Sequence, residues 1–412
     1  MEKRRGDKNF PMKILLVSQY FYPENFKIND LIFSLKDKGN EITVLTGKPN
    51  YSRTNFFDGY GWRSDDFELI NDIPVFRSNL FSRKNGSAFR LFLNYISFAF
   101  LASLKVRKIK GPFDIIFVYQ TSPVTVGIPA IIAKKNFKTP IYFWVQDLWP
   151  ESLKAAGGIK NKFVLNFFNS LTKWIYRNSK KVLIQSNGFK EYIINQGVPN
   201  DKIIYYPNPT EDFYEPLKDV KDYLEFFNTE FFNIVFAGNI GEAQSFQTII
   251  EAIDKLKGLP VNLIVLGDGR YKEIAKSLIK KKGLESHFNF LGSYPPKEMP
   301  KFFSHADALL VSLKKDKIFS LTIPAKIQSY LACGKPIIAS INGEGARIVD
   351  EAKCGVTSPA EDSSLLSEKI KELMNLDKSI LIEMGVNGRA YYKKEFDKES
   401  LLNKLEEVLS SK

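Results

Sequence analysis

Cysteine and histidine are the two rarest residue types in this sequence of 412 residues, with two of each. Cys333 and Cys354 cannot build a disulfide framework, and so low a cysteine content is typical of a reducing compartment. Both histidines, His287 and His305, lie in the second half of the chain, so the sequence offers no histidine-based metal site and no catalytic triad. No D-x-D triplet occurs either. We therefore expect no bound metal and no cofactor.

Long apolar segments are also missing. No apolar run reaches the ~20 residues that span a bilayer. The nearest is 91–104, fourteen residues without a charge between Arg90 and Lys105, a length that predicts a buried or interfacial helix. Residues 1–11 are polar and lack the apolar centre of a signal peptide. Because Met12 directly precedes the first predicted strand, we expect residues 1–11 to be a flexible prefix.

The positive charge is unevenly distributed along the chain. The net charge is +13, but residues 1–210 carry +15 and the remainder carries −2. A basic half of this kind can attract anionic partners, which include anionic lipid headgroups, an anionic small-molecule acceptor and nucleic acid.

Short β-branched runs alternate with helical patterns through both halves. Continuous apolar strands separated by helices indicate parallel strands that are buried on both faces. The predicted strands are 13–19, 41–47, 114–120, 140–147, 181–186, 232–240, 261–269, 308–313 and 335–340. The fold class is therefore α/β, with two doubly wound, Rossmann-like domains.

The length also favours two domains. We place the first domain at 12–205 and the second at 221–385, joined by a Pro-rich and acidic linker at 206–220. Residues 386–412 are predicted to form a helical tail that packs back toward the first domain. Since open parallel sheets bind ligands beyond the carboxyl ends of their strands, we expect functional residues directly after the strands.

Two glycine-containing loops follow strands of the second half. Gly238 and Gly241 allow the backbone to approach a ligand, and the next helix is expected to begin near Ser245, a geometry that suits a diphosphate. Tight turns use glycines in the same way, so the signal is weak. A similar loop, 266–270, adds Arg270. Neither loop has the Gly-Lys-Ser/Thr of a P-loop.

The segment 319–340 predicts a helix with Pro324 and Lys326 in its first turn and Gly334 at its end. A cation at a helix N-terminus is unfavourable by about 0.3–1 kcal/mol, and an anion in the site would reverse the sign. The alternative is a solvated surface lysine.

Glu344 and Arg347 follow the next strand and offer a carboxylate for a ribose diol and a bidentate donor for phosphate. Their alternative interpretation is a helix-entry turn with a surface ion pair.

Carboxylates follow strands of the first half as well. Glu24, Asp147 and Glu151, together with the amide of Gln146, are placed to orient or deprotonate a hydroxyl group. Asp147 is equally well placed as a helix cap, and Trp149 is more consistent with a core residue than with a sugar-stacking platform.

Six segments carry a resemblance to a known family. In chain order they are LLVSQYFYPE, GKPNY, VQDLWPES, FAGNIGEAQ, SLTIPAKIQSYLACGKPIIAS and GEGARIV. From Met12 to its C-terminus the chain resembles a GT-B glycosyltransferase of the retaining family 4. It is most similar to the bacterial subgroup of O-antigen, capsule and colanic-acid assembly, which includes N-acetyl-L-fucosamine transferases.

The resemblance implies two domains that face each other across a cleft. The second half would bind a nucleotide-sugar donor, most often a UDP-sugar, and the first half a polyprenyl-diphosphate-linked saccharide acceptor. No metal or other cofactor is implied, and no protein base is required, because a donor phosphate helps to deprotonate the acceptor. Asp147 and Glu24 are the candidate catalytic residues, as acceptor-orienting groups. The donor-binding candidates are Gly238, Asn239, Gly241, Gln244, Arg270, Ser320, Thr322, Lys326, Glu344 and Arg347.

The chain departs from the wider family at four positions. Asn239 and Gln244 stand where the family has Arg and Lys, and Leu321 and Ser329 stand where it has two glutamates. We hypothesise that other cations supply the positive charge that these positions lack and bind the diphosphate. A carboxylate would contact the ribose. The residues in question are Lys326, Arg347 and Arg270 for the diphosphate, and Glu344 for the ribose.

The basic first half and two apolar segments, 91–104 and 163–181, predict a cytoplasmic protein that binds peripherally to the anionic inner leaflet. Core packing is the alternative for either segment. Two other enzyme readings stay open, a UDP-sugar 2-epimerase and an inverting GT-B transferase. A nucleic-acid-binding module fits the charge but has no supporting motif, so we expect no nucleic acid partner.

Overall fold

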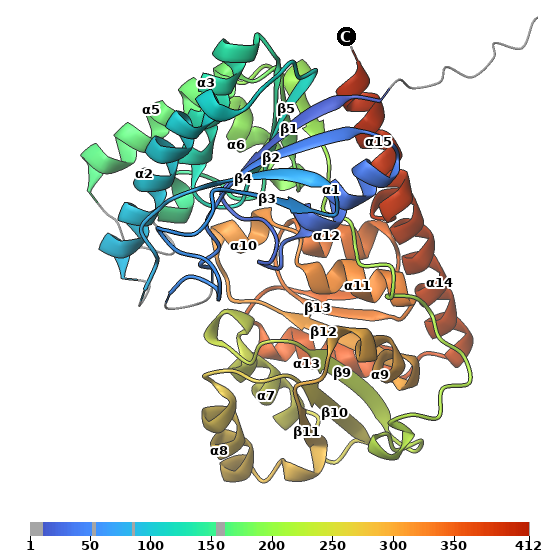
Figure 1. Cartoon of the computed structure of the whole chain (residues 1–412). Coiled ribbons are helices and arrows are strands. Elements are labelled where there is room, and N and C mark those ends of the chain that lie inside the picture. Colours follow the sequence, from blue (N-terminus) through green and yellow to red (C-terminus); the bar gives the residue numbers. More distant parts are fainter. Residues whose placement is uncertain (1–10, 52–54, 85–86, 154–160, 412) are drawn as a thin grey trace, which may run out of the picture. The chain divides into compact units, whose positions relative to one another are not determined.

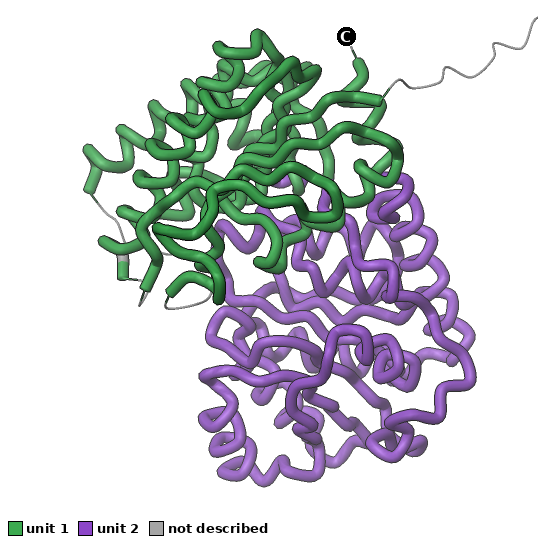
Figure 2. The backbone as a smooth tube through the Cα atoms, viewed as in Figure 1, with its two compact units in different colours: residues 1–185, 189–206, 402–412 green, residues 186–188, 207–401 purple. Residues whose placement is uncertain are grey.

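The computed structural model describes residues 11–51, 55–84, 87–153 and 161–411. The chain divides into two compact units, shown in Figure 2. Unit 1 comprises Met1–Gln185, Phe189–Tyr206 and Leu402–Lys412, and unit 2 comprises Ser186–Gly188 and Pro207–Leu401. Residues 1–10 of the predicted prefix lie outside the described residues.

Unit 1 is built on an eight-stranded sheet with the strand order β3-β4-β2-β1-β5-β6-β7-β8 (Figure 1). Its central strands are buried along their whole length, as expected for strands covered on both faces. The strands are β1 (Lys13–Ser18), β2 (Glu41–Gly47), β3 (Phe67–Ile70), β4 (Ile73–Ser78), β5 (Ile115–Gln120), β6 (Ile141–Val145), β7 (Lys181–Ile184) and β8 (Ile203–Tyr205).

The helices of unit 1 connect successive parallel strands. Because the strand order runs outward from β1 in both directions, right-handed crossovers place helices on both faces of the sheet. They are α1 (Lys27–Asp37), α2 (Ala88–Lys105), α3 (Gly127–Phe137), α5 (Lys162–Asn178) and α6 (Lys190–Asn195).

One pairing in unit 1 differs from the all-parallel expectation. Strands β3 and β4 are antiparallel and are joined by the two residues Asn71 and Asp72. Both residues have positive φ, 47° and 60°, which matches the tight hairpin turns that Asn and Asp favour. The hairpin adds an antiparallel edge to an otherwise parallel sheet.

Unit 2 is built on a six-stranded sheet, entirely parallel, with the order β11-β10-β9-β12-β13-β14. Its core includes buried side chains of β9, β10 and the helix that follows β9. The strands are β9 (Phe232–Ala237), β10 (Val261–Leu266), β11 (Phe288–Gly292), β12 (Ala308–Ser312), β13 (Ile337–Ser340) and β14 (Gly355–Ser358).

The helices of unit 2 follow its strands in the same alternating manner. They are α7 (Phe246–Asp254), α8 (Lys272–Lys282), α9 (Met299–His305), α10 (Lys317–Leu321), α11 (Ala325–Cys333), α12 (Glu344–Glu351), α13 (Ser363–Met374) and α14 (Lys378–Glu395). A last helix, α15 (Lys398–Ser410), begins in unit 2, and its residues from Leu402 onward belong to unit 1.

All nine predicted strands are present, and the prediction of two parallel-sheet α/β units is confirmed. In unit 1 the strand order reverses between β1 and β5, and in unit 2 between β9 and β12. Such reversal points are where ligands bind in open α/β sheets. The loops after β1, β5, β9 and β12 are therefore the first places to look for a site.

The apolar segment 91–104 lies within helix α2. By length and composition alone, Phe89–Lys108 is long and apolar enough to cross a membrane, and it is the one such segment among the described residues. The sequence predicted that segment 91–104 is too short to span a bilayer. The apolar segment in the structure is longer, because the helix continues through the flanking charged residues. Core helices of soluble proteins meet the same criterion, so the finding is weak evidence for a span.

Candidate active site

The loops after β9 and β10 of unit 2 are in direct backbone contact. The amide of Gly238 donates to the carbonyl of Leu266 over 2.7 Å. Gly267 has a φ of +139°, and a Cβ atom at this residue would lie 1.9 Å from the Gly238 carbonyl oxygen. Only glycine fits here. The two turns therefore pack backbone against backbone, next to the reversal point between β9 and β12.

Lys326 reaches this loop from the first turn of α11. A Cβ at Gly238 would lie 2.7 Å from Cε and 3.1 Å from Nζ of Lys326. The Nζ is 3.8 Å from the centre of the Phe236 ring, in cation–π geometry. Lys326 lies in the first turn of α11, as predicted, but Pro324 does not, because its backbone is extended and it is the N-cap residue. The predicted end at Gly334 is confirmed, and Gly334 caps the helix in the left-handed conformation.

The ammonium of Lys326 has no hydrogen-bond partner among the described residues, although the nitrogen atom is buried. Burial lowers the pKa of this group to about 7. A buried charge without a partner is costly, so the site favours either a neutral amine or an anion beside it. The solvated-surface interpretation of Lys326 is wrong, because the nitrogen is shielded from water.

The remaining loop residues after β9 bind one another. Nδ2 of Asn239 donates to Oε1 of Gln244 over 3.2 Å, and a Cβ at Gly241 would lie 2.4 Å from that same Nδ2. Helix α7 begins at Phe246, directly after Ser245, as the sequence predicted. Asn239 and Gln244, which stand where the family has cations, thus stabilise the loop through a neutral hydrogen bond.

Ser320 and Thr322 lie at the C-terminal end of the short helix α10. Their hydroxyl groups donate to the carbonyls of Lys317 and Phe319, over 2.8 and 3.1 Å, so they cap the helix locally. A Cβ at Gly343 would lie 2.0 Å from the Ser320 carbonyl oxygen, which places α10 against the start of α12. Arg270 is exposed in the turn after β10.

Arg347 is paired with carboxylates. Its Nε and Nη2 donate to the two oxygens of the buried Glu344 over 3.0 and 2.8 Å, and its Nη1 pairs with Glu351. This is the helix-entry ion pair given above as the alternative interpretation. The guanidinium is already neutralised, so Lys326 is the described cation best placed for an anion at this edge.

Unit 1 contains a cavity of about 330 Å³ at its own reversal point, here named the aromatic pocket. Its walls come from the loops after β1, β2, β4, β5 and β6 and from helices α2 and α5. Asp147 lines the pocket, and its carboxylate accepts a hydrogen bond from the Ser152 hydroxyl. Burial raises the pKa of Asp147 to about 6. A carboxyl of this kind can orient a hydroxyl group.

Two groups of rings form the walls of the aromatic pocket. The Tyr20 and Phe26 rings stack with centres 5.0 Å apart, and Tyr51 meets both edge-on at 5.2 and 4.9 Å. On the other side, Trp149 contacts Tyr95 and Phe168 at 6.1 and 5.3 Å. Trp149 is 1% exposed, which confirms the core interpretation, and it also lines the pocket.

Comparison with known proteins gives matches in both halves. Residues 27–209 match the model of a glycosyl transferase 4-like domain, and residues 224–391 match the model of glycosyl transferases group 1. The chain is 26% identical over 341 residues to an Escherichia coli protein named as the colanic acid biosynthesis glycosyl transferase WcaI, covering 78% of this chain and 82% of that one. It is also 26% identical to a Pseudomonas aeruginosa protein named as the glycosyltransferase WbjE, over 69% and 72% of the two chains.

A crystal structure of Anabaena HepE in complex with UDP has a similar fold. The TM-score is 0.71, with 16% sequence identity, over 97% of this chain and all of that one. Together with the two parallel-sheet units and the two family matches, this decides the identity. The chain is a GT-B glycosyltransferase of family 4. It depends on a nucleotide-sugar as its donor.

In this transferase, Glu24 fixes a loop of unit 1. Its Oε1 accepts from the backbone amides of Asn50 and Tyr51 over 2.8 and 2.6 Å, and its Oε2 is buried without a partner among the described residues. Burial raises the pKa of Glu24 to about 7. Glu24 does not line the aromatic pocket, but it sets the position of Tyr51, which does.

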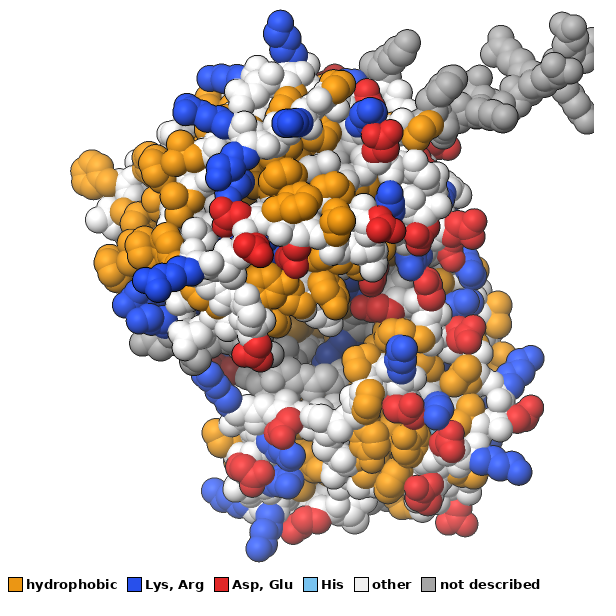
Figure 3. All heavy atoms as spheres, in the orientation of Figure 1, with side chains coloured by type: hydrophobic (Ala, Val, Ile, Leu, Met, Phe, Trp, Pro, Cys, Tyr) orange, Lys and Arg blue, Asp and Glu red, His pale blue; other side chains and the backbone are white. Residues whose placement is uncertain are grey.

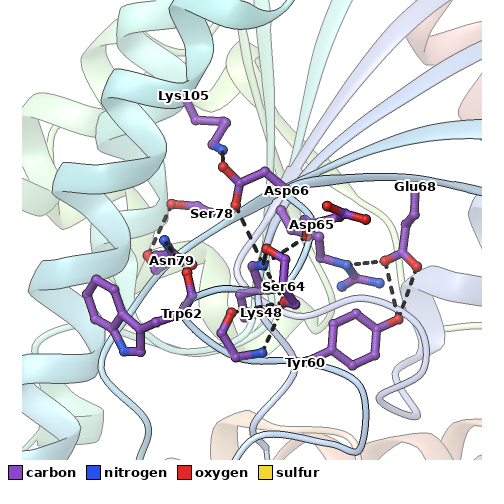
Figure 4. Close-up of polar contacts among 12 residues, drawn as sticks. Lys48, Tyr60, Trp62, Ser64, Asp65, Asp66, Glu68, Ser78, Asn79 and Lys105 are labelled. Carbon is purple, nitrogen blue, oxygen red and sulfur yellow. Dashed lines mark hydrogen bonds and ion pairs between the residues drawn. The ribbon is translucent and has the colours of Figure 1, made fainter.

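Lys48 anchors the same loop from its other end (Figure 4). Its Nζ donates to the backbone carbonyl and the hydroxyl of Ser64, both over 2.6 Å, and to the Asp65 carbonyl over 2.8 Å, and it lies 3.5 Å from Asp66. Asp66 also pairs with Lys105 at the end of α2. The transferase thereby fixes both ends of the 48–51 segment and the C-terminal end of α2.

Two further candidates of the first half, Glu151 and Gln146, make hydrogen bonds within the transferase. The two positions that differ from the family's glutamates, Ser329 and Leu321, lie in α11 and at the end of α10. Glu151 accepts from the Tyr192 hydroxyl over 3.0 Å, and the Gln146 carbonyl accepts from Gln185. Ser329 is buried in α11, where its hydroxyl donates to the Lys326 carbonyl over 3.0 Å, and Leu321 ends α10.

Sequence reasoning missed Arg83 and Tyr95, which line the aromatic pocket. Arg83 lies in irregular backbone before α2, and Tyr95 is one ring in an apolar helix, so no local spacing distinguishes either. Within the described ranges, no three His, Cys, Asp or Glu side chains gather in a way that could hold a metal ion.

Proposed function

We propose that the transferase moves a sugar from a UDP-sugar to a lipid-linked saccharide in the assembly of a surface polysaccharide. The donor diphosphate binds at the carboxyl edge of the unit 2 sheet. The reaction retains the anomeric configuration and needs no metal. The sugar is an N-acetylated 6-deoxyhexosamine such as N-acetylfucosamine, a choice that rests on the sequence resemblance of the subgroup.

The observation that carries this proposal is the buried, unpartnered ammonium of Lys326 beside Gly238. A diphosphate here would accept from Lys326 and from loop amides other than those of Gly238 and Ile240, which already donate to Leu266 and Asp268. As the bond to the sugar breaks, negative charge grows on the leaving diphosphate, and a fixed cation in a site shielded from water stabilises it. Lys326 thus supplies the charge that Asn239 and Gln244 lack.

Several features support the choice of acceptor and location. WcaI is named for colanic acid biosynthesis, and HepE was crystallised with UDP. Helices α2 and α5 of unit 1 carry exposed aromatic side chains, and residues 1–210 are strongly basic. We propose that this face holds the protein on the anionic cytoplasmic leaflet, where a polyprenyl-diphosphate-linked acceptor resides.

Within unit 1, Asp147 orients the acceptor hydroxyl. The donor phosphate takes the hydroxyl proton as the new bond forms on the face from which the diphosphate leaves. Glu24 contributes by holding the Asn50–Tyr51 backbone.

The decisive experiment measures UDP binding to Lys326→Ala by calorimetry at pH 6.5. We expect the affinity to fall by about tenfold or more, because a charge-assisted contact is lost. Lys255→Ala is the matched control, since Lys255 is exposed at the end of α7 in the same unit. Equal affinity of wild type and Lys326→Ala would contradict the assignment of the diphosphate site.

A second experiment addresses Asp147. Asp147→Asn should lower kcat by about 10²-fold or more while leaving UDP affinity intact, since the carboxylate acts on the acceptor alone. Loss of UDP affinity in this variant, or an unchanged kcat, would show that Asp147 has only the helix-capping role.

A further inference from the structure

The aromatic pocket of unit 1 is apolar over most of its lining. Among its described lining residues the only charged side chains are Arg83 and Asp147. The hydroxyl of Ser122 accepts from the indole of Trp149 over 3.2 Å, and that of Ser152 donates to Asp147. Apart from Asp147, which is left to the acceptor hydroxyl, most of the lining surface is apolar. The larger part of the pocket therefore fits an apolar group.

Arg83 is the one cation among the described lining residues, and no carboxylate of the described ranges pairs with it. Its guanidinium carbon lies 4.7 Å from the centre of the Tyr51 ring and 5.8 Å from that of Tyr20. Its Nη2 donates to the Tyr95 hydroxyl over 3.3 Å. No ion pair of Arg83 occurs among the described residues, and most of its donors are unused by the contacts above. A half-buried guanidinium that contacts three tyrosines and has no ion-pair partner among the described residues favours an anion.

The pocket shares a wall with an exposed apolar surface. Leu91, Phe92 and Ile96 of α2 line the pocket, and the Phe92 and Ile96 side chains are also exposed. The same helix exposes Phe89 and Phe100, at 68% and 63%. Figure 3 shows hydrophobic side chains gathered over α2 and α5 in this part of unit 1. A ligand of this pocket can therefore extend from it onto an apolar surface.

An apolar pocket, one unpaired guanidinium and a continuous apolar exit match one chemical class, a prenyl phosphate. We propose that the aromatic pocket binds the first isoprene units of the lipid-linked acceptor, with Arg83 on its phosphate. This inference rests on the proposed function and adds which part of the acceptor unit 1 recognises. Arg83 acts as a positioning residue, because it holds the lipid phosphate and not the reacting hydroxyl.

The test uses calorimetry on the full chain with three soluble probes: geranyl phosphate, geraniol and inorganic phosphate. We expect geranyl phosphate to bind, geraniol to bind more weakly, and inorganic phosphate not to bind measurably. Arg83→Met should weaken geranyl phosphate by about tenfold or more and leave geraniol unchanged, since only the phosphate contact is lost. Arg83→Lys should retain part of the affinity, because it keeps the charge.

Arg63→Met is the matched control, because Arg63 is exposed and does not line the pocket. Melting curves of each variant exclude unfolding as the cause of a loss. Equal binding of geraniol and geranyl phosphate, tight binding of inorganic phosphate, or indifference to Arg83→Met would each overturn the inference.

UDP binding by the same wild-type sample separates the two proposals. If UDP binds and geranyl phosphate does not, only the lipid inference fails. If geranyl phosphate binds in an Arg83-dependent manner and UDP does not, the lipid site stands and the donor-site proposal fails.

Discussion

Lys48 and Lys326 are both lysines with a buried nitrogen, but only Lys48 has partners. Lys48 donates three hydrogen bonds and lies near Asp66, whereas the ammonium of Lys326 has a ring and glycine backbone around it. Burial lowers the pKa of both. The first lysine stabilises a loop, and the second has hydrogen-bonding capacity that no described residue uses.

Lys326→Met should stabilise the free protein most at low pH. The folded pKa of about 7 lies below the ordinary value of 10.5, so the unfolded chain holds this proton more tightly. The buried charge therefore costs most below pH 7, and the stability of the wild type rises as the pH increases from about 7 toward 10.5. Melting curves at pH 6 and pH 9 test this.

We expect Lys326→Met to raise the Tm at pH 6 and to raise it much less at pH 9. Each kcal/mol corresponds to roughly 2–4 °C in a unit of this size. Lys255→Met serves as the exposed control. An equal change at both pH values would show that the Lys326 amine does not titrate in this range.

Residues whose role depends on a strand end could be found from the sequence. Gly238 is predictable because it follows β9 directly, and Lys326 because it lies in the first turn of a helix. The unpartnered state of Lys326 and the carboxylate partners of Arg347 could not be predicted, since both depend on tertiary packing. Arg83 left no local signal at all, because its neighbours Tyr20, Tyr51 and Tyr95 are distant in sequence.

At the scale of elements, α2 has two unlike faces. One face is tied into unit 1 by the buried Asn94, which accepts from Gln19 over 2.7 Å and donates to Asn50 and to the Phe81 carbonyl. The other face exposes aromatic side chains, and α5 likewise exposes Phe163 and Phe167. Such helices suit the surface of a bilayer, with the polar face kept in the protein.

The protein should sediment with vesicles that contain anionic lipid at low salt and be released at high salt. Basic residues near an anionic surface contribute about 1 kcal/mol each, and salt screens them. Phe100→Ser together with Phe167→Ser should weaken the binding further, whereas Ile274→Ser on α8 of unit 2 should not. Sedimentation that is independent of lipid charge would contradict the electrostatic part of this prediction.

Element positions were predicted better than element pairing. The β-branched runs located nine strands, because buried parallel strands need continuous apolar sequence. The β3–β4 hairpin was missed, since its Asn71–Asp72 turn lies outside the helix-and-strand alternation. Strands β8, β11 and β14 were missed as well, because they are short and only partly buried. The extent of α2 was also underestimated, because its ends carry charges.

At the scale of the whole molecule, the chain returns to unit 1 after completing unit 2. Leu402–Lys412 belongs to unit 1, where Leu405 and Leu409 of α15 are buried. Lys38 contacts Glu406 of the same helix over 3.0 Å. Unit 1 therefore depends on the C-terminal helix for part of its buried core.

Leu405→Ala should destabilise the protein by about 2–5 kcal/mol, because it leaves a cavity at a fully buried position. Glu407→Ala, an exposed position on the same helix, should change the stability by less than about 0.5 kcal/mol. Denaturant titration of both variants measures the difference. A small effect of Leu405→Ala would mean that α15 contributes little to unit 1.

The glycine contact between the loops after β9 and β10 has a practical consequence for engineering. Where Gly238 and Gly267 touch, no side chain separates the two turns, so this part of the proposed donor site is backbone packed against backbone. Peptide groups cannot be exchanged by substitution, and a methyl group at Gly267 would push the turns apart. Attempts to retarget the enzyme to another sugar should therefore vary the neighbouring side chains and keep this pair of glycines untouched.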